Sequence, residues 1–449
     1  MRIRLLRDAW ALAIETLSWI ELQRLGERLA LNKAAKQLKI KDSKTIGLAH
    51  KLVFETIRAR NFIDYILNSV LTPRSLKDFR LGLRAFLRLY TYQTQIASHD
   101  FRKAVDMARI GRSILGWQEF SEVEETLGKI LNIQPNVILK GISDEEKIGL
   151  STYNPLWFVK DCFKILGRKE ALECLESFKE IPPTYVRINT LKGSEETLLK
   201  NIESDHVVLE KVHQLKYAYK VKKSQHPLTR TRSFREGFFF IQDKASCLSV
   251  EVANPKSGMT VLDVCAAPGA KTTYLAQLME NKGTIYSIDY SKRRMNVWKR
   301  ETGRMGVKIA ALIVADARKP LAISVPADLV ILDPPCTSTG AFGRIPSAKW
   351  RLTKNSVFRM ARLQWEMLNQ CAECVKDEGT LVYSTCSLTL EENEMLIERF
   401  VKWHPEFMFA ETLPKIGLDG LRGQTKCQRL YPHLHECNGF FVAKLMKES

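Results

Sequence analysis

Residues 327–336 read ADLVILDPPC, and residues 380–387 read TLVYSTCS. Short β-rich runs bounded by Pro and Gly are typical of buried strands in an α/β sheet. Ligands of open α/β sheets bind at the carboxyl ends of the strands, so Cys336 and Cys386, each just past a strand, could face one crevice. The alternative is that both are small buried core residues, as most free cysteines are.

The chain around these stretches alternates between strand and helix patterns from residue 237 onward. This alternation predicts a mostly parallel, doubly wound sheet, that is, an α/β Rossmann-like domain over residues 237–449. The expected strands are 261–264, 284–288, 310–314, 328–332, 380–383 and 440–445. The expected helices are 272–279, 292–303, 355–375 and 391–403.

Residues 263–272 read DVCAAPGAKT, a strand end, a tight turn of small residues and a helix start. Small residues let the backbone approach a ligand closely, and the spacing matches neither a dinucleotide fingerprint nor a phosphate-binding P-loop. Asp289 ends the next expected strand, where a carboxylate can accept hydrogen bonds from a ribose, and Asp316 follows the third strand, where an adenine amino group would lie. Each Asp alone could be a turn or cap residue, but Asp263, Asp289 and Asp316 together favour an adenosine ligand without phosphates. S-adenosylmethionine is the candidate.

Two further regions precede the Rossmann-like domain. Residues 1–145 have the apolar periodicity of an all-α bundle, with Arg80, Arg84 and Arg88 on one helix face as either a phosphate track or an ordinary solvated face. Residues 150–236 predict a small α+β (RRM-like) module. Its end, residues 211–235, carries eight Lys or Arg and no acid: Lys211, Lys216, Lys220, Lys222, Lys223, Arg230, Arg232 and Arg235. With interleaved aromatic residues, this segment is expected to contact nucleic acid, the alternative being a mobile solvated loop.

Composition points the same way. The 449 residues carry a formal net charge of +19, which favours a polyanionic partner, with a membrane surface as the alternative. Ten cysteines in a chain of this length are no disulfide framework, and no apolar run approaches the roughly 18 residues of a membrane span. We expect a cytoplasmic protein with reduced thiols, a monomer, and no stable membrane association.

These motifs together resemble the NOP2/Sun (Fmu, RsmB-like) family of S-adenosylmethionine-dependent RNA 5-methylcytosine methyltransferases. The resemblance implies methylation of C5 of a cytosine in rRNA or tRNA, a class I methyltransferase domain, and a NusB-like helical RNA-binding domain at the N-terminus. The segments that carry it are 187–189, 242–246, 263–272, 289–291, 316–317, 333–336, 349–350, 384–387 and 439–441.

The resemblance also implies roles for individual residues. Cys386 would be the nucleophile that adds to C6 of the base, Cys336 would remove the C5 proton or release the product, and Asp333 would hold the base edge. Lys271 and Lys349 are candidates for lowering a thiol pKa. The implied cofactor-binding residues are Cys265, Ala266, Ala267, Pro268, Gly269, Ala270, Lys271, Asp289, Arg294, Asp316 and Asp333. The chain departs from the family pattern at Ala270, Ser347 and Asn438.

Other interpretations stay open at this point. A non-catalytic RNA-binding factor could keep the fold, and a DNA cytosine methyltransferase would need only the Pro-Cys motif. Two groups of possible metal ligands are present, the pair Cys371 and Cys374, and the cluster Cys427, His433, His435 and Cys437. Neither has the spacing of a standard zinc site, so packing is expected and no metal.

Overall fold

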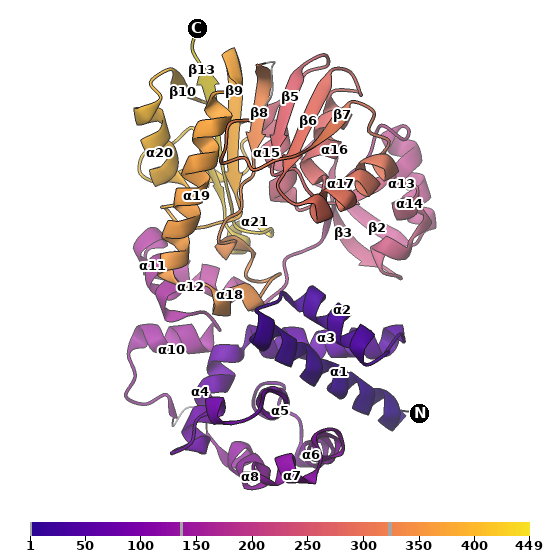
Figure 1. The fold of residues 1–449 in the computed structure, drawn as a ribbon, viewed down its shortest axis with the longest axis vertical. Helices are drawn as coiled ribbons and strands as arrows, with labels where there is room; N and C mark the ends of the chain where they lie inside the picture. The colour runs from indigo at the N-terminus through magenta and orange to yellow at the C-terminus, as the bar shows by residue number, and fades with distance from the viewer. Residues whose placement is uncertain (1, 135–137, 322–325) are drawn as a thin grey trace. The chain divides into compact units, whose positions relative to one another are not determined.

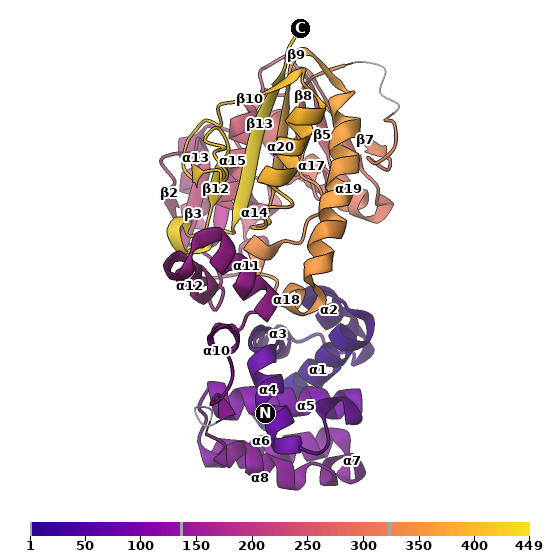
Figure 2. The same ribbon diagram turned by 90° about the vertical axis from the view of Figure 1, so that its left-hand side faces the viewer.

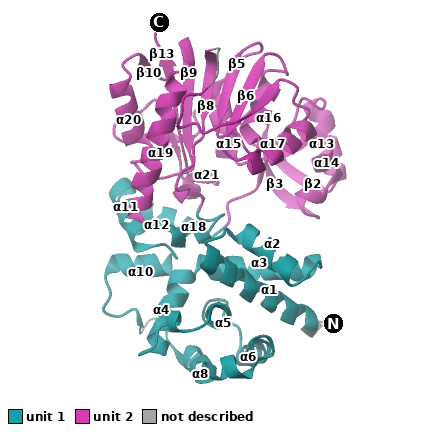
Figure 3. Ribbon diagram, in the orientation of Figure 1, with its two compact units in different colours: residues 1–180, 342–352 teal, residues 181–341, 353–449 magenta. Residues whose placement is uncertain are grey.

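The computed structural model describes residues 2–134, 138–321 and 326–449 (Figure 1). The chain divides into two compact units, Met1–Glu180 with Phe342–Leu352, and Ile181–Ala341 with Thr353–Ser449 (Figure 3).

The described part of the first unit is built of helices, as the sequence predicts. Trp10 and Phe86 are buried in its core, and the side chains of Asp42 and Asp100 cap helices by accepting hydrogen bonds from backbone N–H groups. The helices are α1 (Arg2–Gln23), α2 (Glu27–Gln37), α3 (Ser43–Arg58), α4 (Arg60–Leu71), η1 (Leu76–Asp78), α5 (Leu81–Thr91), η2 (Tyr92–Ile96), α6 (Phe101–Leu115), α7 (Trp117–Ser121), α8 (Glu124–Asn132), α10 (Asp144–Ser151), α11 (Leu156–Leu166), α12 (Arg168–Ser177) and α18 (Ser347–Arg351).

The arginine stripe of α5 is not a phosphate track. Arg88 lies between two acids, with Nε 2.7 Å from Asp64 Oδ1 and Nη1 hydrogen-bonded to Glu21. Arg84 pairs with Glu21 at 2.8 Å, and Arg80 with Glu119 at 2.6 Å. The periodicity that predicts a shared face carries no sign of the carboxylates that α1, α4 and α7 bring to these arginines.

Replacing Arg88 by Ala is expected to destabilise the first unit by about 3 kcal/mol, because two partly buried carboxylates each lose the more buried of their two arginine partners. Urea unfolding measures this. Arg80→Ala is the matched control, since the Arg80 side chain is 82% exposed against 7% for Arg88, and its loss should cost less than about 1 kcal/mol. Equal losses in the two variants would contradict the assignment of Arg88 as a buried partner.

The second unit contains two sheets. The smaller sheet is antiparallel, with strand order β2-β3-β1-β4. Its elements are β1 (Tyr185–Ile188), α13 (Glu195–Ser204), β2 (Val207–Lys211), β3 (Ala218–Ser224), η3 (Leu228–Arg230), α14 (Arg232–Arg235) and β4 (Phe239–Ile241). The basic segment 211–235 therefore lies largely on β3, η3 and α14, and not on a mobile loop.

The larger sheet has the order β11-β12-β13-β9-β8-β5-β6-β7, with β10 beside β13. Strands β5 to β9 are parallel to one another, and β13 runs antiparallel to β9. The strands are β5 (Thr260–Val264), β6 (Thr284–Asp289), β7 (Ala310–Val314), β8 (Ala327–Leu332), β9 (Val375–Thr385), β10 (Phe407–Ala410), β11 (Leu418–Asp419), β12 (Gln428–Leu430) and β13 (Phe440–Lys447). The predicted doubly wound sheet is present, and its antiparallel pairs are those that involve β10, β11, β12 and the closing strand β13.

Helices cover both faces of this sheet (Figures 1 and 2). Because side chains alternate along a strand, Leu329 and Ile331 of β8 pack on the face of α15 and α16, and Val330 and Leu332 pack on the face of α19 and α20. The helices are α15 (Lys244–Ala253), α16 (Ala270–Leu278), α17 (Lys292–Met305), η4 (Thr339–Ala341), α19 (Lys354–Ala372), α20 (Glu394–Trp403) and α21 (Pro432–His435). None of the helices within the described ranges has the length and apolar character needed to cross a membrane.

Candidate active site

The parallel strands bring the sequence-predicted residues to one edge of the larger sheet. Val264, Leu332 and Tyr383 are register partners near the ends of β5, β8 and β9. Cys265, Asp333 and Cys386 follow these strand ends, and Asp289 ends the neighbouring β6. The residues that the sequence motifs predict around one crevice therefore lie along the same edge of the sheet.

The two cysteines meet within this row. Sγ of Cys336 lies 3.3 Å from Sγ of Cys386, although the two residues are fifty positions apart. Both are reduced and half-buried. Ser338 Oγ lies 3.3 Å from Cys386 Sγ. If the two cysteines were ordinary core residues, their side chains would be fully buried. Instead, the thiols are half-buried and in contact with each other.

The environment distinguishes the two thiols. A hydrogen bond from the Cys336 thiol lowers the pKa of Cys386 and raises that of Cys336 well above its ordinary value. Burial and the carboxylates Asp333 and Glu392 act against this lowering, while the ammonium group of Lys271 is the nearby cation. Since the thiolate is the nucleophilic form of cysteine, this environment favours Cys386 over Cys336 for the role of nucleophile.

A buried carboxylate, Glu392, joins the loops that carry the cysteines. It is 0% exposed, and it accepts hydrogen bonds from both loops and from α19. On one side it binds the backbone N–H of Thr337 at 2.9 Å and also the Thr337 hydroxyl, and on the other the hydroxyl of Ser387 at 2.6 Å. Thr389 and Gln364 complete the set, each at 2.9 Å. The sequence predicts Glu392 only as a residue near the start of a helix, 391–403. The hydroxyl residues that follow each cysteine were the signal that could have drawn attention to it.

A pair of glycines fixes the same loops against the last strand. Gly340 N donates to Cys386 O, and Gly439 N donates to Gly340 O at 2.8 Å. A Cβ on Gly340 would lie 2.2 Å from Gly439 O. No other residue fits there without moving a backbone.

The turn of small residues directly follows the carboxyl end of β5. Cys265 has φ +67° and Gly269 has φ +110°, and a Cβ on Gly269 would lie 3.3 Å from Trp298. Helix α16 begins at Ala270 directly after this turn, so Ala266, Ala267 and Pro268 connect the strand to the helix. Asp263, by contrast, faces inward: Thr272 donates to it at 2.5 Å, and burial raises its pKa to about 6.

Asp289 has the features of a ribose-binding acid. It is 2% exposed, and Oδ1 accepts a hydrogen bond from Ser291 N at 3.0 Å. Oδ2 lies 3.2 Å from Arg294 Nη1 but receives no hydrogen bond within the described residues. A buried carboxylate oxygen without a donor calls for one, and ribose hydroxyls are suitable donors. Arg294 also donates to Ala267 O at 2.5 Å, which ties the acid to the turn.

Asp316 and Asp333 have other partners. Arg318 binds both oxygens of Asp316, and these hydrogen bonds lower the Asp316 pKa to about 2. An adenine amino group would therefore have to share this carboxylate with Arg318. Asp333 forms an ion pair with the buried Lys271. Although burial disfavours the charged amine, this pairing raises the Lys271 pKa.

Lys349, which the sequence predicts as a candidate for lowering a thiol pKa, lies in a different compact unit from the two cysteines. It belongs to the first unit, where it is 1% exposed and donates to Tyr153 O at 2.9 Å. Burial lowers its pKa well below the ordinary value. The neighbouring Trp350 donates to Ile57 O, so the motif 349–350 anchors its segment to the helices of the first unit.

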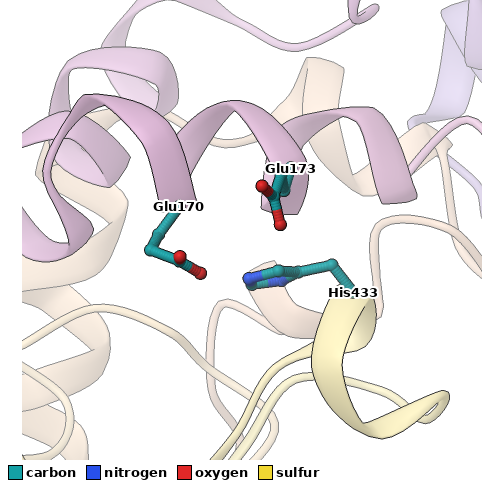
Figure 4. Close-up of side chains that lie close together, drawn as sticks. All are labelled: Glu170, Glu173 and His433. Carbon is teal, nitrogen blue, oxygen red and sulfur yellow. The ribbon is translucent and has the colours of Figure 1, made fainter.

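The possible metal ligands do not gather. Across the described ranges, no three of Cys427, His433, His435 and Cys437 bring their ligand atoms together. Burial raises the pKa of Cys427 to about 12, which disfavours the thiolate that zinc requires. Figure 4 shows His433 projecting from α21, and it also labels Glu170 and Glu173, one turn apart on α12 of the first unit.

Substituting Glu392 by Gln is expected to remove about 2–4 kcal/mol of stability and most of the activity, because an amide group would face the donors of Thr337 and Gln364. Thermal unfolding measures the first effect. Glu391→Gln is the matched control: Glu391 pairs with Lys354 nearer the surface, so its loss should cost less than about 1 kcal/mol. A Glu392 variant with unchanged melting would show that the two loops do not depend on this carboxylate.

Comparisons with known proteins agree with this geometry. Residues 250–446 match the family model described as 16S rRNA methyltransferase RsmB/F. The chain is 30% identical over 451 residues to the probable ribosomal RNA small subunit methyltransferase B of Bacillus subtilis, covering 97% of this chain and 98% of that protein. The crystal structure of PH0851 superposes with a TM-score of 0.85 at 30% identity, covering 98% of this chain and 99% of that one. NSun6 from Pyrococcus horikoshii, solved with the ligand SFG, has a TM-score of 0.61 at 26% identity over 66% of this chain and 98% of its own.

Proposed function

Because the chain belongs to the NOP2/Sun (RsmB/F-like) family of RNA cytosine-C5 methyltransferases, we propose that it methylates C5 of a cytosine in RNA through a covalent bond between Cys386 and C6 of that base. The chain is an enzyme of the methyltransferase class, and its cofactor is S-adenosylmethionine. The contact of the Cys336 and Cys386 sulfurs at 3.3 Å carries the covalent part of the proposal.

The thiol pair answers a chemical difficulty. C5 of cytosine is a poor nucleophile, and addition of a thiolate to C6 makes C5 electron-rich enough to take a methyl group. S-adenosylmethionine supplies that methyl group on a sulfonium centre when it is bound. Cys386 forms the S–C6 bond, since its environment favours the thiolate. The electron pair of the C5–C6 double bond shifts towards C4 and N3, which makes C5 nucleophilic. C5 would then bond to the methyl carbon while the methyl–sulfur bond of the donor breaks, and the sulfonium would leave as a neutral thioether.

Cys336 is assigned to the release step. While Cys386 is a thiolate, Cys336 holds its proton as the hydrogen-bond donor to it. Once the Cys386 sulfur is bound to carbon, that negative charge is gone, and Cys336 can give its proton to water and become a base. Its thiolate accepts the C5 proton, the C5–C6 double bond re-forms, and the Cys386–C6 bond breaks to return the Cys386 thiolate.

Asp333 and Lys271 are proposed to orient the base. Asp333 is half-buried at the end of β8, and its pairing with Lys271 fixes the carboxylate beside the thiols. This carboxylate can accept a hydrogen bond from the N4 amino group at that edge of cytosine. The Lys271 ammonium group beside it offsets the negative charge that moves to N3 during attack at C6.

The cofactor is proposed to bind between the small-residue turn and the ends of β5 and β6. Asp289 would accept hydrogen bonds from the ribose, because one of its buried oxygens lacks a donor. The turn at Cys265, Ala266, Ala267, Pro268, Gly269 and Ala270 would lie against the methionine part, and Arg294 would position Asp289.

Ribosomal RNA is the proposed substrate, since the full-length similarity is to a small-subunit rRNA methyltransferase. On β3 and the segments that flank it, the exposed side chains of Lys216, Lys223 and Arg230 form no ion pair within the described residues, which leaves their charges available for phosphates. Binding of RNA by a NusB-like first unit remains a prediction.

The roles of the two cysteines are tested by single substitutions. Cys386→Ala should abolish methyl transfer while cofactor binding persists. Cys336→Ala should trap the covalent protein–RNA adduct, seen as a slowly migrating band on a denaturing gel. The reverse pattern in the two variants would exchange the assignments.

The ribose contact is tested by cofactor titration. Asp289→Asn should weaken S-adenosylmethionine binding by about tenfold or more in calorimetry, because a buried acceptor of the ribose hydroxyls is lost. Asp316→Asn should weaken it less, because Arg318 already holds that carboxylate. An equal loss at both positions would show that Arg318 gives way to the adenine.

A further inference from the structure

Ser338 places a hydroxyl group between the two active-site sulfurs. Its Oγ lies 3.3 Å from Cys386 Sγ and 3.7 Å from Cys336 Sγ. The residue has φ +55°, in the left-handed region that L-residues with a Cβ seldom adopt. Strain of this kind is retained where the surrounding structure holds the residue for a purpose.

The neighbours of Ser338 fix that position. Thr337 on one side is bound to Glu392 through its backbone N–H and its hydroxyl. Thr339 on the other side accepts a hydrogen bond from Leu388 N at 2.8 Å. Ser338 O accepts from Ala341 N at 2.9 Å and closes the turn. The hydroxyl is thus presented to the sulfurs by a backbone that is anchored on both sides.

We propose that Ser338 is a further catalytic residue, whose hydroxyl donates a hydrogen bond to the sulfur of Cys386 and stabilises its thiolate. The proposal rests on the function proposed above, in which Cys386 is the nucleophile. Ser338 keeps its own proton throughout, so no bond to it is made or broken.

The direction of the hydrogen bond follows from the state of the sulfur. A hydroxyl can donate or accept, and while Cys386 is protonated its S–H donates to Ser338 Oγ at 3.3 Å. A thiolate can only accept, so the hydroxyl must then donate. Cys386 would receive two donors, the thiol of Cys336 and the hydroxyl of Ser338. The same donors would stabilise the charge that returns to this sulfur when the Cys386–C6 bond breaks.

The other groups around Cys386 are charged or titratable. Hydrogen bonds from Cys336 and Ser338 lower the pKa of the Cys386 thiol. Burial and the carboxylates Asp333 and Glu392 act in the opposite direction. Lys271 is the cation on this side. Among these groups Ser338 alone does not titrate, so its removal changes thiolate stability without changing the charge of the site.

The test uses two variants of the full-length protein. Ser338→Ala removes the hydroxyl and keeps a Cβ at the positive φ, whereas Ser338→Gly removes the hydroxyl and also relieves the backbone. The measurement is the pH dependence of Cys386 alkylation by iodoacetamide, followed by mass spectrometry of the peptide that contains Cys386. In both variants the midpoint should rise by about 0.5 to 1 pH unit, with a three- to tenfold slower reaction on the acidic side and an unchanged rate at high pH.

Ser384→Ala is the matched control. Ser384 is buried two residues before Cys386, and its hydroxyl has no hydrogen-bond partner within the described residues, so the alkylation midpoint should not move. Unchanged midpoints in both Ser338 variants overturn the proposal, as does a change in Ser338→Ala alone, which would assign the effect to the backbone. Alkylation needs no RNA or cofactor, so a shifted midpoint without altered methylation would count against the role of Cys386 and not against the hydrogen bond.

Discussion

One buried carboxylate joins the parts of the site that the chain supplies separately. Glu392 accepts hydrogen bonds from Thr337 in the first cysteine loop and from Ser387 and Thr389 in the second. A buried carboxylate is costly unless its oxygens are fully hydrogen-bonded, so the loops that satisfy it are held together by the same requirement. The sulfurs are neighbours because the residues directly after each of them share this acceptor. The Rossmann-like sheet brings the loops to one edge, and Glu392 sets their distance.

Much of the second unit follows from sequence pattern alone. Short apolar runs predict the strands β5 to β9. The rule that ligands bind at the carboxyl ends of parallel strands predicts that Cys336 and Cys386 lie close together. These predictions depend on periodicity and on strand direction, which are local properties. The arrangement of Asp289 at the end of β6 was predictable for the same reason.

The misjudged residues depend on distant partners. Arg84 and Arg88 have the spacing of an exposed stripe, yet Glu21 and Asp64 turn them inward. Lys349 was placed near the thiols by its motif, but its segment is packed among the helices of the first unit. Glu392 and Ser338 were missed because a glutamate near a helix start and a serine in a turn have ordinary local explanations. Only the folded chain shows which hydroxyls and which sulfurs lie beside them.

The contact between Gly340 and Gly439 bears on the order in which the site can form during synthesis. Gly340 belongs to the loop after Cys336, and it is held by a hydrogen bond from Gly439, immediately before the last strand, β13. When both cysteines have just emerged from the ribosome, Gly439, which holds their loops through Gly340, has therefore not yet emerged. In the nascent protein both cysteine loops would lack this contact until β13 is inserted, so the glycine contact can form only after residue 439 has emerged.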